Sequence, residues 1–297
     1  MYRTFVILRH TFLEAVVQPI FALLMGIGAA ILVIYGLLPF FTLGEDTVMY
    51  KSVGLDVILL LVLIVTLFAT SKSIHEEIED RTMLTLMSKP IHKWEVLFGK
   101  YLGIILAALL GVVILGAVML ALTCYRIPGD YQLRWASLDD RDIKEIFDYR
   151  MMHCVGIVAS LFLVWLQISV LAAIGVALST RFSLVVNLPT VILIYIAGNL
   201  TRFLFPLEHR SEAVRLFAHA ASSLLPFLQT FDIRQYTVFQ SISVPGTSFF
   251  NTRGAISISA ILGYIGIASA YAIAYAGFAL SAGMWLFQTR ELGGAEG

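Results

Sequence analysis

The chain has 297 residues, of which 59% are hydrophobic and 13% charged, and its mean hydropathy is +0.87. Soluble domains carry about 25% charged residues, so this composition predicts an integral, all-α membrane protein. The formal net charge of zero gives no sign of a nucleic-acid partner, and two cysteines make neither a disulfide framework nor a metal site.

Residues 1–19 precede the first long apolar run. Phe5, Leu8, Phe12 and Val16 recur at helical spacing, with charged residues between them. This pattern predicts a cytoplasmic helix lying on the membrane surface, and Pro19 ends it.

Six apolar runs approach the roughly 20 residues that a membrane-spanning helix needs. They are Ile20–Phe41, Val53–Thr70, Trp94–Leu122, Val155–Leu178, Leu184–Phe205 and Ala255–Phe287. The first run is not followed by a small-x-small cleavage site, so it is expected to be a retained span rather than a signal peptide. The second run is the shortest, and Asp56 is expected at its outer end. An even number of spans places both chain ends on one side, within a single transmembrane domain over residues 1–297.

Short connections favour a cytoplasmic location for both ends. Arg181 lies in the tight turn Ser179–Ser183, which is then inside. The first outer loop has only Lys51 against Glu45 and Asp46. Both agree with the excess of basic residues in cytoplasmic loops.

The most densely charged part of the chain is the loop over residues 71–93. An acidic run comes first, with Glu76, Glu77, Glu79 and Asp80, and Arg81 follows it. These side chains are too polar for lipid, so the loop is expected in water. Thr82 can then cap a short helix that ends before Pro90. Met83, Leu84, Leu86 and Met87 give that helix an apolar stripe, which suits either docking onto another protein or lying on the lipid surface.

Two longer segments, 123–154 and 206–254, are predicted outside. Each contains a candidate helix, starting at Ser137 and at Ser211. These two segments either pack as outer lids without contacting substrate or take part in substrate contact. The sequence pattern leaves both alternatives open. Cys124 and Cys154 end the third span and begin the fourth, so both are expected near the outer face; whether they pair stays open.

Candidate chemistry within the chain is sparse. Gly99-Lys100 lacks the upstream glycine and following Ser/Thr of a phosphate-binding loop, and the His75–Glu79 stretch lacks the second histidine of a zinc protease. We therefore expect no catalytic residue, cofactor or metal. The spans carry few ionisable groups, which argues against an ion-coupled carrier. Gln167, Asn187 and Asn199 are candidates for lining a substrate path, with helix–helix hydrogen bonding as their ordinary alternative.

The 77–100 stretch resembles a known family. Glu77, Glu79, Thr82, Pro90, Glu95, Gly99 and Lys100 match the permease subunits of type-2 ABC transporters, nearest to the subgroup containing the permease of the nitrous-oxide-reductase maturation system. Arg81 and Leu84 depart from the pattern, where the family usually has Gly and often has Glu. Leu225-Pro226 with Asp232 also resembles the family's segment before the last span.

The resemblance implies a six-span, type V exporter-like transmembrane domain in a bacterial inner (plasma) membrane. It implies a separate ABC ATPase that binds ATP, with loop 71–93 as the coupling loop, and a second permease copy or similar permease. The leading hypothesis is a transport subunit without an ATPase site of its own. The alternative is a non-transporting membrane anchor for an ATPase that matures an extracytoplasmic protein.

Overall fold

The computed structural model of the protein describes residues 2–38, 46–80, 92–130, 140–204, 225–240, 242–247 and 255–288. Its helices are α1 (Tyr2–Val17), α2 (Pro19–Leu37), α3 (Asp46–Thr70), the π-helix η1 (Ser71–Glu76), α4 (Glu77–Glu79), α6 (Lys93–Asp130), α7 (Asp140–Ser179), α8 (Leu184–Leu204), the 3-10 helix η3 (Leu228–Phe231), α10 (Arg234–Thr237) and α11 (Ile258–Gln288). Strands β1 (Ile242–Ser243) and β2 (Ile256–Ser257) form one short parallel pair.

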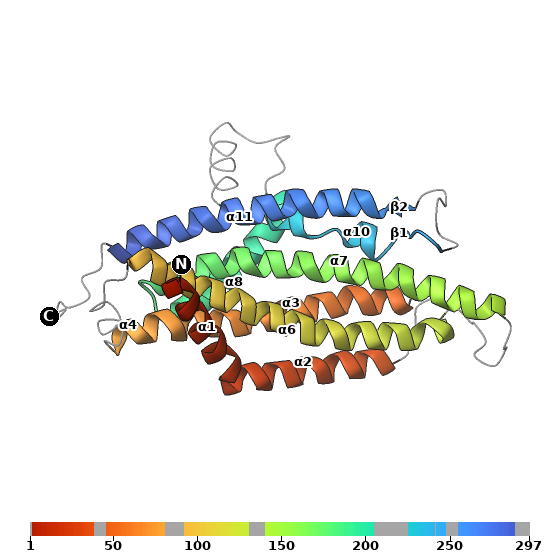
Figure 1. Cartoon of the computed structure of the whole chain (residues 1–297), viewed down its shortest axis with the longest axis horizontal. Coiled ribbons are helices and arrows are strands. Elements are labelled where there is room, and N and C mark those ends of the chain that lie inside the picture. The colour runs from red at the N-terminus through yellow and green to blue at the C-terminus, as the bar shows by residue number, and fades with distance from the viewer. Residues whose placement is uncertain are drawn as a thin grey trace.

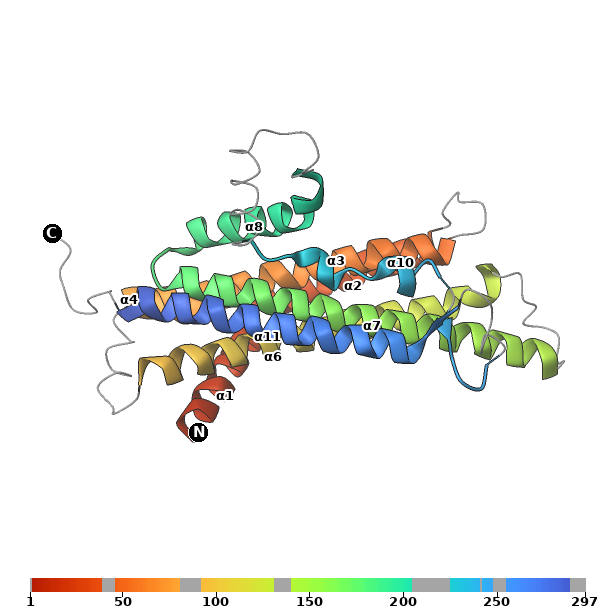
Figure 2. The ribbon, with the colours of Figure 1, turned by 90° about the horizontal axis from the view of Figure 1, so that it is seen from above.

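The long helices form one elongated bundle around α7. Helices α3, α6 and α11 pack directly against α7, and α2 covers α3 and α6 (Figure 1). Helix α8 lies along one side of the bundle, which is clearest in the view from above (Figure 2). The start of α1, α4 and the last turn of α11 all lie at the same end of the bundle (Figure 1).

Five helices in the described part of the chain are long and apolar enough to cross a membrane, namely those over Pro19–Leu37, Thr47–Glu79, Lys93–Ile127, Ile143–Ser179 and Ile258–Gln288. Helix α8 contributes a shorter apolar stretch, Leu184–Leu200. The protein is therefore a helical, multi-spanning membrane protein. The sixth span and the side on which the chain ends lie stay predictions.

Helices α6 and α7 are longer than the sequence pattern predicted. They have 38 and 40 residues, or roughly 60 Å each at about 1.5 Å per residue, against about 30 Å for a bilayer core. Most of the predicted outer segment 123–154 consists of the continuations of these two helices. The described residues of the helix predicted from Ser137 are helical, but they are continuous with the next span and belong to α7.

Part of the second predicted outer segment, 206–254, packs against the long helices. Leu228, Phe231 and Ile233 are buried and pack in one apolar cluster with residues of α7, α8 and α11. A Cβ added at Gly198 of α8 would lie 2.8 Å from the Pro226 carbonyl oxygen, so this segment touches α8 backbone to backbone. Leu228, Phe231 and Ile233 thus belong to the apolar core of the bundle, and the location of the segment outside the membrane stays a prediction. The helix predicted from Ser211 lies outside the described residues.

Helix α1 crosses α6 at close range. A Cβ added at Gly103 would lie 2.7 Å from the Leu8 carbonyl oxygen, and one at Gly99 would lie 3.0 Å from Ile7. Small residues allow such approaches between membrane helices. Gly99, one of the motif residues, thus serves the α1–α6 contact. The placement of α1 at the membrane surface stays a prediction.

The two cysteine thiols meet between α6 and α7, where the Sγ atoms of Cys124 and Cys154 are 3.5 Å apart. A disulfide needs a separation of about 2.05 Å, which modest side-chain movement can supply. We predict that copper–phenanthroline oxidation of membranes will protect both thiols from a maleimide that adds measurable mass. Reduction should restore two reactive thiols, and Cys124→Ser should keep Cys154 reactive throughout. Two thiols that stay reactive after oxidation would contradict this α6–α7 packing.

Candidate functional site

The membrane helix α3 continues without a break into the predicted coupling loop. It passes through the π-helix η1 and the short α4 before the described chain stops at Asp80. Within η1, Ser71, Ser73 and Ile74 are buried. π-helical turns occur mostly as single turns inside α-helices and often at functional sites. This turn therefore joins α3 directly to the loop.

A buried lysine from α6 holds this turn. The Lys100 side chain is 3% exposed, and its Nζ lies 2.6 Å from Glu77 Oε1. The same ammonium donates to the Ser73 hydroxyl at 3.2 Å and to the Ser73 carbonyl oxygen. A buried charge is tolerated when it is paired and hydrogen-bonded. Lys100 thus fastens η1 and α4, which continue α3, to the first two turns of α6, and we call this arrangement the Lys100 clamp.

Two further contacts order the same end of the bundle. His75 Nε2 lies 3.1 Å from Glu79 Oε1, one turn along the helix. The His92 backbone amide donates to Glu95 Oε2 at 3.2 Å, which is half of a capping box at the start of α6. The motif residues Glu77, Glu95 and Lys100 therefore all have structural tasks within this chain.

The predicted coupling residues divide into three groups. Glu76, Glu79 and Asp80 are exposed, as the sequence predicted. Glu77 differs, because its side chain turns inward to Lys100 and is 25% exposed. The others, Arg81, Thr82, Met83, Leu86, Met87 and Pro90, lie outside the described residues. The docking role of this loop is thus a prediction, and Glu77 is better placed to hold the loop than to contact a partner.

Asn187 also belongs to this end of the bundle. Its Nδ2 lies within hydrogen-bond distance of the Ser179 hydroxyl at 2.7 Å, the Ser71 hydroxyl at 3.1 Å and the Gly175 carbonyl oxygen at 3.2 Å. These groups come from α7 and η1, so Asn187 ties α8 to both. Its geometry is that of helix–helix hydrogen bonding, the alternative to lining a substrate path.

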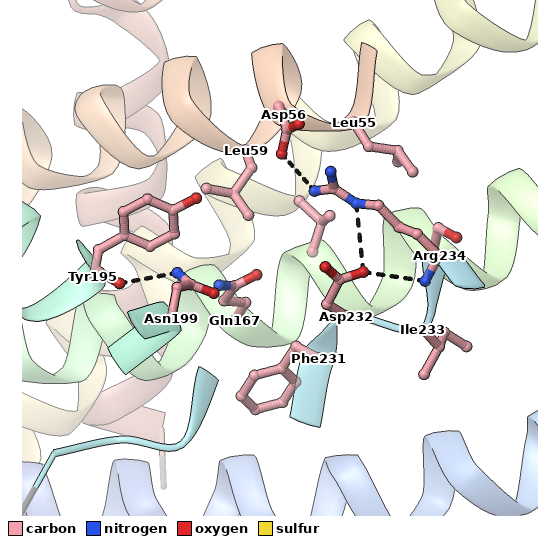
Figure 3. A pocket seen from close by; sticks show the side chains of 12 residues that line it. Leu55, Asp56, Leu59, Gln167, Tyr195, Asn199, Phe231, Asp232, Ile233 and Arg234 are labelled. Carbon is pink, nitrogen blue, oxygen red and sulfur yellow. Dashed lines mark hydrogen bonds and ion pairs between the residues drawn. The ribbon is translucent and has the colours of Figure 1, made fainter. Parts of the chain in front are cut away.

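The other two predicted polar residues line one cavity. Gln167 of α7 and Asn199 of α8 lie in its wall, together with residues of α3 and of the 231–234 segment (Figure 3). The cavity has a volume of about 80 Å³. Its polar lining consists of Asp56, Ser160, Gln167, Tyr195, Asn199, Asp232 and Arg234.

Three charged residues form one side of the cavity (Figure 3). Arg234 Nη2 lies 2.6 Å from Asp56 Oδ1, and Arg234 Nε lies 3.6 Å from Asp232 Oδ1. Burial opposes the charge on Arg234, but the carboxylates of Asp56 and Asp232 outweigh it and raise the pKa of the guanidinium above its ordinary value. Arg234 is therefore a fixed cation that joins α3 to α10.

Sequence reasoning missed most of this cavity. Asp56 was expected at the outer end of its span, and this stays a prediction, but its pairing with Arg234 was not foreseen. Arg234 and Asp232 were assigned to an outer segment. The available signal was the charged residue within an apolar run, because ionisable residues in membrane helices usually have a partner and a function.

The family model of the ABC-2 family transporter protein matches residues 11–184, which is more than half of the chain. No curated protein matches it in a sequence comparison. With its apolar spanning helices, the protein is a membrane component of the transporter type. The chain belongs to the ABC-2 transporter family.

The Lys100 clamp predicts a specific loss of stability. Lys100→Met should lower the free energy of unfolding by about 1–3 kcal/mol, because Glu77 and the Ser73 carbonyl lose their partner. Lys72→Met is the matched control, since Lys72 is exposed in the same turn, and it should have little effect. Reversible unfolding of the purified chain in detergent measures both. Equal effects of the two substitutions would mean that the clamp contributes nothing.

Proposed function

We propose that this chain is the permease subunit of an ABC transporter, moving a substrate with energy from ATP hydrolysed on a separate nucleotide-binding subunit. Membership of the ABC-2 family carries the proposal. The continuous path from α3 through η1 to the loop supports it, because a coupling loop must be joined firmly to the spans that it moves.

In this proposal the ATPase receives the loop over residues 71–93. The apolar stripe of Met83, Leu86 and Met87 docks in the ATPase, and the exposed Glu76, Glu79 and Asp80 face basic residues of that subunit. Closure of the ATPase then displaces the ends of α3 and α6 together, because Lys100 ties them. Coupling of this kind requires a structural element whose states both subunits bias.

The proposed assembly contains two ATPase copies and two permease chains, as a homodimer or with a similar permease. We place it in the bacterial inner membrane with both chain ends in the cytoplasm. ATP is bound by the partner subunit, so the permease needs no cofactor.

The alternative function is a membrane anchor for an ATPase that matures an extracytoplasmic protein, as the resemblance to the nitrous-oxide-reductase maturation system implied. The polar cavity favours transport over anchoring, because an anchor has no need of charged residues within its helix bundle. ATP-dependent movement of a substrate into sealed vesicles would separate the two functions.

Docking of the loop is tested by Leu86→Asp. A charge at a desolvated contact is costly, so we expect this substitution to abolish co-purification of a co-expressed ABC ATPase while the chain still inserts. Leu133→Asp, in the loop predicted on the opposite side of the membrane, is the control and should retain the ATPase. Unchanged co-purification and ATP hydrolysis in Leu86→Asp would remove the docking role of this loop.

A further inference from the structure

The cavity between α3, α7, α8 and the 231–234 segment carries a net negative charge. Arg234 is engaged on all sides, since Nη2 and Nε face Asp56 and Asp232 and Nη1 donates to the Ser52 carbonyl oxygen at 3.4 Å. Both carboxylates contact Arg234 through Oδ1, and their side chains are 56% and 52% exposed. Two carboxylates against one guanidinium leave a formal charge of −1 with oxygen atoms open to a ligand.

An unpartnered buried amide lies in the same cavity. Gln167 is 5% exposed and lies beside Asn199 in the cavity wall (Figure 3). Within the described residues its side chain has no hydrogen-bond partner, and neither has the Tyr195 hydroxyl. Buried polar groups are normally hydrogen-bonded, so an open amide facing a cavity is available to water or to a polar ligand.

The volume of the cavity and the chemical groups in its lining limit the kinds of ligand that it can bind. A volume of about 80 Å³ accommodates several water molecules or the head group of a small molecule. Its lining offers several hydrogen-bond acceptors, namely the carboxylate oxygens of Asp56 and Asp232 and the side-chain oxygen of Gln167, whereas Asn199 Nδ2 already donates to Tyr195 O at 2.9 Å. Rings of Tyr195 and Phe231 also line the cavity and can face a cation.

A metal ion fits this cavity less well than an organic cation. No group of three or more His, Cys, Asp or Glu residues is arranged for a metal in the parts of the chain that the structure describes. A primary ammonium group instead offers three N–H donors and one positive charge, which matches the open acceptors and the charge of −1.

We propose that this cavity binds the primary ammonium group of a small organic amine, held by Asp232, Asp56 and Gln167. The ammonium neutralises the cavity charge and donates to the open oxygens, while the apolar wall accepts the adjoining carbon atoms. That such an amine is the transported substrate rests on the permease function proposed above. Binding itself does not depend on it.

The test titrates the full-length chain in lipid nanodiscs with ethylammonium and follows the midpoint of thermal unfolding. Ethylammonium should raise the midpoint in a saturable way, because a ligand that binds only the folded state stabilises it. Ethanol lacks the charge, and tetraethylammonium lacks N–H donors and exceeds the cavity, so neither should do so. Equal shifts with ethanol, or no shift with ethylammonium, would overturn the proposal.

Two variants locate the binding. Asp232→Asn should weaken ethylammonium binding by about tenfold or more, the effect expected for a lost charge-assisted hydrogen bond. Gln167→Leu should weaken it by about fivefold while leaving unliganded stability intact, because the native amide has no partner to lose. Glu145→Gln, an exposed carboxylate elsewhere on α7, should bind as the native chain does. Unchanged affinity in both cavity variants would place the binding elsewhere and refute the assignment.

The outcome is separable from that of the permease proposal. A chain that assembles with its ATPase but ignores ethylammonium would refute the amine site alone. A chain that binds ethylammonium in the cavity but takes up no ATPase would refute the permease function and leave the amine site standing.

Discussion

The structure depends on one buried charge, the ammonium group of Lys100. Its neighbours Ser73 of η1 and Glu77 of α4 lie on the continuation of α3, whereas Lys100 lies in α6. Because an unpaired ammonium at this depth would be strongly unfavourable, the two helix ends cannot separate without losing its partners. Lys100 Nζ also donates a hydrogen bond to the Ser73 carbonyl oxygen in the π-helical turn. It therefore fixes both the spacing of α3 and α6 and the direction in which the chain enters the loop.

The bundle contains a second cluster of charged residues, in which the number of carboxylates for each cation differs. At Lys100, one cation has one carboxylate and two serine oxygens, so the cluster is closed. At Arg234, one cation faces Asp56 and Asp232, and the cluster opens onto a cavity. A closed ion pair suits a mechanical link, whereas an open one can change partners when a ligand arrives. In the proposed function, the Lys100 cluster belongs to the part of the chain that transmits movement, and the Arg234 cluster belongs to the part that recognises a ligand.

The apolar runs predicted the spanning helices α2, α3, α6, α7 and α11 well, because length and hydropathy alone decide whether a helix can lie in lipid. The helix ends were predicted poorly. Lys51 was assigned to a loop, yet it lies within α3, where its Nζ is 2.9 Å from His153 Nδ1 and donates to Val238 O at 3.1 Å. A charge ends an apolar run in sequence, but it does not end a helix when distant residues supply its partners.

The dependence on distant partners also limits how much of the candidate site can be predicted from the sequence. Glu77, Gly99 and Lys100 could be singled out from the motif, but the Glu77–Lys100 pair and the Gly99 contact with α1 join separate elements. Gln167 and Asn199 could be named as polar residues in apolar spans. Their convergence with Asp56 and Arg234 depends on how residues 225–240 enter the bundle, which composition does not encode.

In the proposed function, the cytoplasmic continuation of α3 and the start of α6 move as one unit when the ATPase acts. The most direct test of this joint movement is the electron–electron distance between spin labels at the exposed Glu76 and His92. The labels are introduced into a chain with both cysteines replaced by serine, in complex with the ATPase. We expect the same distance distribution in the nucleotide-free and vanadate-trapped states, and a broader one when Lys100 is replaced by Met. A nucleotide-dependent change of this distance in the chain that retains Lys100 would contradict it.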